Sequence, residues 1–163
     1  MSRHKCTVAF LFLLMISVRP SSASDATNDR ATLKGIDLVK VACDIRPEDE
    51  LFGITRGQLL TDVELQLRKA GIKVGESKTA SFLYVNVNVK DSGVGTYAVA
   101  LEISFRQAVS LDRAPATKNM VPTWGIYPVV LTTTHARYSE FCRQYLRDLV
   151  DQFANAFLSV NPK

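Results

Sequence analysis

A short segment near the C-terminus combines three side chains that can do chemistry. His135, Glu140 and Cys142 occur in the sequence HARYSEFC. Imidazole, carboxylate and thiolate groups are zinc ligands, and a Cys–His pair can supply a nucleophile. If the segment is helical, His135 and Cys142 are about 10 Å apart, too far for a shared metal ion or a dyad. We therefore predict no metal, no cofactor and no catalytic residue here, and interpret His135 as a surface or capping residue.

Other motifs of catalysis are missing from the sequence. There is no G-x-S-x-G nucleophile elbow, and the GVG at 93–95 falls in a predicted turn between two strands. The acids of PEDE, at 47–50, are typical of a solvated loop. The sequence therefore favours a binding protein over an enzyme. The alternative is a small hydrolase-like enzyme with a loop-built site near His135.

Cys43 and Cys142 are the cysteines that follow an N-terminal Cys6. In an oxidising compartment two such residues can form a disulfide. The predicted topology places the end of the first strand and the start of the last helix at the same end of the domain. Two alternatives stay open, a disulfide between Cys43 and Cys142 or two buried thiols.

Two groups of polar and aromatic side chains are candidates for binding. In SFLYVNVNVK, at 81–90, apolar residues alternate with Tyr84, Asn86 and Asn88, so these three share one face of a strand. An exposed face of this kind suits contact with a protein or a glycan, and a merely solvated sheet face is the alternative. Trp124 lies in a segment interrupted by prolines. Tryptophan is common at binding hot spots, although core packing is the alternative.

The hydrophobic pattern predicts the elements that position these residues. Strands are predicted over 35–45, 81–90, 96–111 and 120–131, and helices over 55–70 and 133–160, with polar loops at 46–53 and 112–119. The order is β-α-β-β-β-α, with a right-handed parallel crossover first and a meander after it. It predicts an α/β (α+β) two-layer sandwich, a mixed four-stranded sheet with two helices on one face. The other face, with Tyr84, Asn86 and Asn88, is left uncovered.

The N-terminus is typical of an export signal. A basic start precedes an apolar run over 6–18, and small residues precede a predicted cleavage site after residue 23. We predict a signal peptide at 1–23, a flexible tail at 24–33, a single domain at 34–163 and a periplasmic or secreted location. Without Arg3, Lys5 and Arg19 the formal charge falls from +4 to +1, which does not favour nucleic-acid binding. No later stretch is long and apolar enough for a membrane span.

The phrases LFGITRGQLLTDVELQLRKAGIKV, FLYVNVNV, YAVALEISFRQAVSLDR and FANAFLSVNPK resemble small bacterial exported proteins of unknown function. The predicted topology is similar to the curli-secretion CsgG-like and penicillin-binding-protein activator LpoB-like envelope domains. That resemblance implies an assembly or interaction domain, although the lipidation cysteine typical of those proteins is missing. We therefore predict an exported module that contacts an envelope protein or glycan, with homo-oligomerisation through the uncovered face as a further alternative.

Overall fold

The computed structural model describes residues 27–76 and 81–162 of the 163-residue chain. The predicted signal peptide lies outside the described residues. The sheet has the order β1-β2-β3-β4, with β1 parallel to β2 and the other pairs antiparallel. The strands are β1 (Val41–Ile45), β2 (Phe82–Asp91), β3 (Thr96–Leu111) and β4 (Ala114–Thr134).

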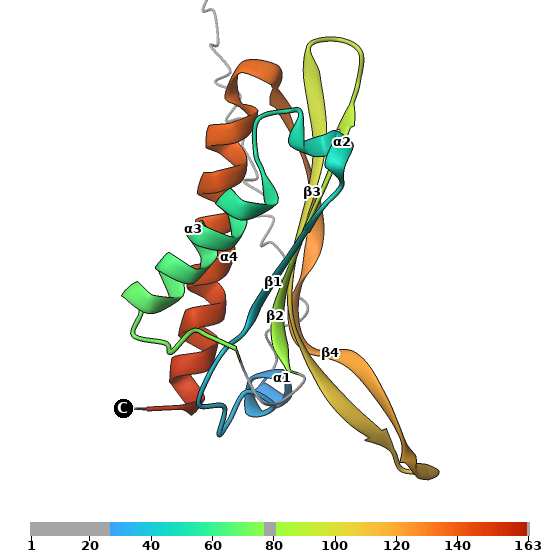
Figure 1. Ribbon diagram of the computed structural model, residues 1–163, viewed down its shortest axis with the longest axis vertical. Helices are drawn as coiled ribbons and strands as arrows, with labels where there is room; N and C mark the ends of the chain where they lie inside the picture. The colour runs from blue at the N-terminus through green and yellow to red at the C-terminus, as the bar shows by residue number, and fades with distance from the viewer. Residues whose placement is uncertain (1–26, 77–80, 163) are drawn as a thin grey trace, which may run out of the picture.

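Two long helices, α3 (Arg56–Lys69) and α4 (Tyr138–Val160), cover one face of this sheet, as predicted (Figure 1). The Thr55 side chain accepts a hydrogen bond from the Gln58 backbone and the Gln58 side chain accepts one from the Thr55 backbone, so a capping box starts α3. The helices lie side by side, and Arg143 of α4 donates two hydrogen bonds to Asp62 of α3, at 2.7 and 2.8 Å. No helix in the described part of the chain is long and apolar enough to cross a bilayer.

The core lies between the sheet and the two helices. Every second residue of β2 and β3 is buried there: Leu83, Val85, Val87, Val89, Tyr97, Val99, Leu101, Ile103 and Phe105. From α4, Phe153 packs between Phe105 and Trp124, with ring centroids 5.8 and 5.2 Å away. Burial of an aliphatic or aromatic side chain contributes about 1.5–3 kcal/mol. The two-residue period of the strands therefore fixes which face meets the helices.

The segment before β1 differs from the predicted flexible tail. Residues Thr27–Ala31 form a short helix, α1, and Leu33 is fully buried in the core. Asn161, beyond the end of α4, makes two hydrogen bonds to this segment. Its side-chain amide N–H donates to the Leu33 carbonyl at 2.9 Å, and its side-chain oxygen accepts from the Gly35 N–H at 2.8 Å. These contacts join residues more than a hundred positions apart, so they cannot be predicted from the local sequence.

The first strand and the loop that follows it also differ from the sequence-based expectation. β1 begins at Val41, and only an isolated bridge from Val39 to Val74 precedes it. The acidic segment forms a short helix, α2 (Pro47–Glu50), in which Asp49 is 1% exposed. Asp49 accepts two hydrogen bonds from Arg46 and one from the Val89 N–H. One acid of the predicted solvated loop is therefore a buried link between α2 and β2.

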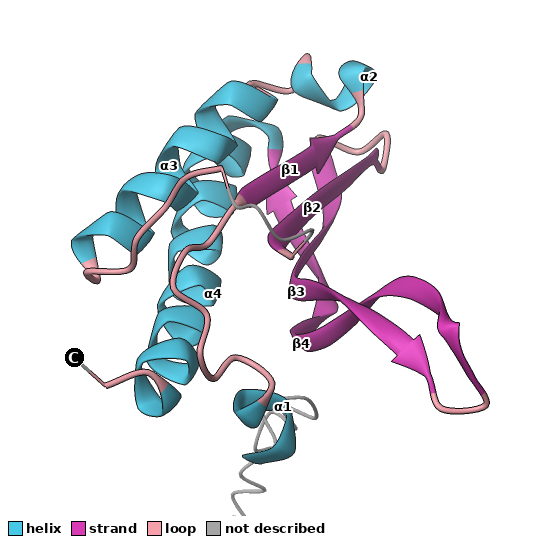
Figure 2. Ribbon diagram, turned by 60° about the horizontal axis from the view of Figure 1, so that its bottom comes forward, coloured by secondary structure: helices cyan, strands magenta, loops and turns pink. Residues whose placement is uncertain are grey.

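The predicted polar loop at 112–119 is instead the end of a long hairpin. β3 and β4 continue past the body of the sheet and pair as far as Leu111 and Ala114. We call residues 107–121 the arm; Figure 2 shows it projecting away from the helices. At its tip, residues 112–119 are exposed except for the half-buried Ala114, so the alternation of apolar and polar residues that identifies a half-buried strand is missing there.

Candidate binding face

The sheet face opposite α3 and α4 is the surface that the sequence predicts to be uncovered, and we call it the open face (Figure 1). Residues paired across neighbouring strands share a face. The register pairs Asp44 with Asn86, Asn86 with Glu102, and Asn88 with Ala100. The open face is formed by Asp44, Tyr84, Asn86, Asn88, Ala98, Ala100, Glu102 and Arg106.

A chain of polar contacts holds Tyr84 in place on this face. Its hydroxyl donates to Asp44 Oδ2 at 3.1 Å, and Asp44 Oδ1 accepts from Arg56 Nη2 at 3.1 Å. The Arg106 guanidinium lies over the Tyr84 ring, 4.0 Å from its centroid. Burial and then the bond to Asp44 raise the pKa of Tyr84, so the hydroxyl stays a neutral donor at physiological pH. The ring is therefore an ordered feature of the face.

Asn86 and Asn88 are the unengaged polar groups of the open face. Among the described residues, neither side-chain amide makes a hydrogen bond. Their neighbours on β3, Ala98 and Ala100, are small, and Asn88 lines a shallow hollow of about 330 Å³ with them. Each amide offers both a donor and an acceptor. This arrangement suits a partner that brings its own polar groups to a flat surface.

His135 begins the short 3-10 helix η1 (His135–Arg137), between β4 and α4, and its backbone N–H donates to the Gly95 carbonyl in the turn that joins β2 to β3. Its ring stacks on Tyr97, with centroids 4.0 Å apart, and its Nε2 is 3.3 Å from Asp91 Oδ1. Hydrogen bonds from the Gly93 N–H and then from His135 lower the pKa of Asp91. Within residues 27–76 and 81–162, no three His, Cys, Asp or Glu side chains are grouped closely enough to hold a metal ion. The described contacts of His135 join the turn to the start of α4.

Cys43 and Cys142 are free thiols in the structure. Cys142 is fully buried on α4, and Cys43 is partly buried on β1. Burial raises the pKa of each thiol to about 12. Since the thiolate is the nucleophilic form, neither group is reactive at neutral pH.

Trp124 is a packing residue, not an exposed anchor. It is 2% exposed and lies edge-on to Phe153. Tyr127, three residues further along β4, is 69% exposed. The two prolines of this segment do mark an edge strand, since β4 pairs with β3 alone. Trp124 pairs with Phe105 of the core, and paired residues share a face, so Trp124 faces the core. Register shifts against β3 flank this pair on both sides, and we call the irregular stretch of β4 between them the kink.

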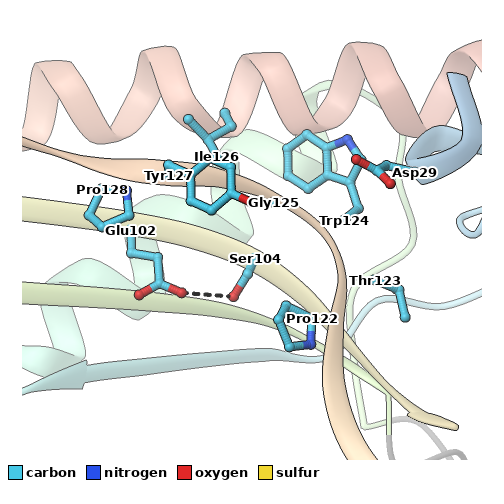
Figure 3. A pocket seen from close by; sticks show the side chains of 10 residues that line it. All are labelled: Asp29, Glu102, Ser104, Pro122, Thr123, Trp124, Gly125, Ile126, Tyr127 and Pro128. Atoms are coloured by element: carbon cyan, nitrogen blue, oxygen red, sulfur yellow. Dashed lines mark hydrogen bonds between the residues drawn. The ribbon is translucent and has the colours of Figure 1, made fainter. Parts of the chain in front are cut away.

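The kink in β4 opens a cavity that sequence reasoning missed. The cavity has a volume of about 230 Å³ and lies at the edge of the sheet (Figure 3). Glu102 and Ser104 line it on the side away from α4, while Trp124 lines it on the α4 side. The only signal in the sequence is the spacing of Pro122, Gly125 and Pro128, which indicates an irregular strand but not a cavity.

Comparison with known proteins gives little beyond this geometry. No protein-family model matches the chain, and no curated protein matches it. Among solved structures, the chain is similar to a minor lipoprotein from Acinetobacter baumannii, with a TM-score of 0.39 and 10% identity, over 76% of this chain and 91% of that one.

Proposed function

We propose that the protein is an exported interaction module of the bacterial envelope, which binds a partner protein through the open face around Tyr84, Asn86 and Asn88. The observation that carries the proposal is a sheet on which, within residues 27–76 and 81–162, the long helices cover one face, and the other face presents amides without a hydrogen bond beside an ordered aromatic ring. The apolar run at 6–18 supports export.

The rigidity of the contact groups supports binding. Asn86 and Asn88 lie on β2, which pairs with β1 on one side and β3 on the other. Tyr84 is held by Asp44 and Arg106. Groups that are already ordered lose little conformational entropy when a partner arrives. Tyr and Arg are also enriched among the residues that dominate protein–protein binding energy.

A glycan is the second candidate partner, because the amides and the Tyr84 ring offer polar groups next to an aromatic surface. The position of Arg106 favours a protein. Its guanidinium covers one face of the Tyr84 ring, so that face is closed to a sugar ring. The same guanidinium and the nearby Glu102 carboxylate present charge to an approaching protein surface.

The experiment is a quantitative pull-down from envelope extract with three proteins: wild type, Tyr84→Ala/Asn86→Arg, and Asn155→Arg. Asn155 is exposed on α4, so its variant adds the same charge on the helical side. We expect a protein captured by wild type and Asn155→Arg but lost with the open-face variant. Equal capture by all three proteins would contradict the proposal.

The mass of the purified protein separates this proposal from self-association. If the open face packs on a second copy, light scattering will show a dimer that Asn86→Arg converts to a monomer. The proposal expects a monomer at all concentrations for both proteins. A glycan partner would instead appear as capture that survives removal of extract proteins by protease.

A further inference from the structure

The cavity at the kink of β4 has the dimensions of a single-side-chain pocket. Its volume of about 230 Å³ lies between the roughly 150 Å³ cavity that holds benzene and the roughly 300–1,000 Å³ pockets of drug-sized ligands. Its shape depends on Gly125. A Cβ at this position would lie 3.1 Å from Ser104 Cβ and 3.2 Å from the Ile103 carbonyl oxygen, so a larger residue would require β3 or β4 to shift by a few tenths of an ångström.

The charged residues of the lining are both acidic. Asp29 of α1 and Glu102 of β3 lie at opposite ends of the lining, and no basic side chain of residues 27–76 or 81–162 belongs to it (Figure 3). Glu102 accepts one described hydrogen bond, from Ser104 Oγ at 3.3 Å. A carboxylate has about four acceptor positions. Arg106 Nη2 forms an ion pair with Glu102 Oε1 at 3.8 Å, longer than a hydrogen bond, while the same guanidinium lies over the Tyr84 ring.

The rest of the lining is apolar or aromatic. Pro122, Ile126 and Pro128 supply hydrocarbon surface, and Trp124 and Tyr127 supply rings. Lysine and arginine side chains combine an apolar stem with a cationic head. Such a stem matches the prolines and the isoleucine, while the head is attracted by the carboxylates and by the face of an aromatic ring. Anionic ligands are disfavoured by the same two carboxylates.

We infer that this cavity binds the cationic side chain of a lysine or arginine, with Glu102 as the residue that receives the charged head. The inference rests on the proposed function, because Glu102 belongs to the open face and the side chain comes from the partner protein. This cavity would make the contact selective, because only a partner with a basic residue opposite the kink of β4 could fill it.

The test is an NMR titration of the ¹⁵N-labelled protein with Nα-acetyl-lysine methylamide and Nα-acetyl-arginine methylamide. Nα-acetyl-norleucine methylamide, which lacks the charge, is the matched control ligand. We expect saturable shifts of the Gly125 and Tyr127 amide signals with the two cations and none with norleucine. Shifts of equal size with norleucine, or no saturable shift with either cation, would overturn the inference.

Three variants test whether Glu102 is the residue that binds the charged group of the lysine or arginine side chain. Glu102→Gln keeps the size of the side chain, and we expect it to weaken cation binding at least about tenfold, as for loss of a charge-assisted hydrogen bond. Tyr127→Ala, at an exposed position, should weaken it less. Glu140→Gln, an exposed change on α4, should leave it unchanged. Wild-type affinity in Glu102→Gln, with an undisturbed spectrum, would exclude Glu102 as the receiving group.

The titration and the pull-down fail independently. If the open-face variant loses its partner while the cations do not bind, the proposed function stands and the inference about the cavity falls. If the cations bind in a Glu102-dependent way while no partner is captured, the ligand class of the cavity stands and the proposed function falls.

Discussion

At the scale of single residues, the period of two along β2 correctly places Tyr84, Asn86 and Asn88 on the face without helices. The same reasoning cannot find the cavity beside Glu102. That cavity depends on register shifts between β3 and β4, between Leu101 and Ile103 and again after Phe105. A register shift is a property of two paired strands, so the sequence of one strand does not contain it.

A substitution at Gly125 tests the close approach of β4 to β3. We expect Gly125→Ala to lower the free energy of unfolding by about 1–3 kcal/mol, because the new methyl group overpacks against Ser104 and the Ile103 carbonyl. Gly57→Ala is the control, since a Cβ there meets nothing within 4 Å and alanine favours the helix. Urea unfolding of both variants gives the comparison. Equal stability of Gly125→Ala and wild type would contradict the packing described.

The raised pKa values of the two buried thiols lead us to expect that the free energy of unfolding depends on pH. Burial raises the pKa of Cys43 and Cys142 from 9.0 to about 12. Below pH 9 both states keep these protons. Between pH 9 and pH 12 the unfolded chain releases them while the folded chain retains them, so the free energy of unfolding falls as pH rises.

We expect urea midpoints of the reduced protein to fall between pH 8 and pH 10.5, and to fall less in Cys43→Ala/Cys142→Ala. Iodoacetamide should label both cysteines only after unfolding. A disulfide-linked peptide containing Cys43 and Cys142 in the unreduced, purified protein would contradict the free-thiol state.

At the scale of elements, helices α3 and α4 were predictable because each has an amphipathic repeat, and α3 has a capping box besides. α1 and the tip of the arm, residues 112–119, were not. The segment around Leu33 is fixed by Asn161, and residues of the tip are exposed except for the half-buried Ala114. Patterns of burial predict elements that face a core, and neither of these segments shows such a pattern.

The arm is separable from the body of the fold. We expect replacement of residues 108–120 by an Asn-Gly turn to leave the free energy of unfolding within about 0.5 kcal/mol, since exposed residues away from the core contribute little. The type I′ turn allows the two strands to close earlier. Thermal unfolding checks the body, and the pull-down checks the open face. Loss of cooperative unfolding would show that the arm supports the core.

At the scale of the whole molecule, two helices on one side of a four-stranded sheet leave a layer without a cover. The uncovered face followed from the predicted topology. The crossover places α3 on one face, and the apolar stripe of α4 is best buried beside α3 on the same face. The partner cannot be predicted in the same way. Tyr84 and the asparagines define a surface, whereas the identity of the partner depends on a second molecule.

The most direct test of the central claim is site-specific photo-crosslinking in the cells that make the protein. A benzophenone amino acid replaces Asn88 on the open face in one strain and Asn155 on α4 in another. We expect ultraviolet light to join the protein to one distinct partner protein from position 88 and not from position 155. Crosslinks from position 155 alone, or the same products from both positions, would contradict a binding role for the open face.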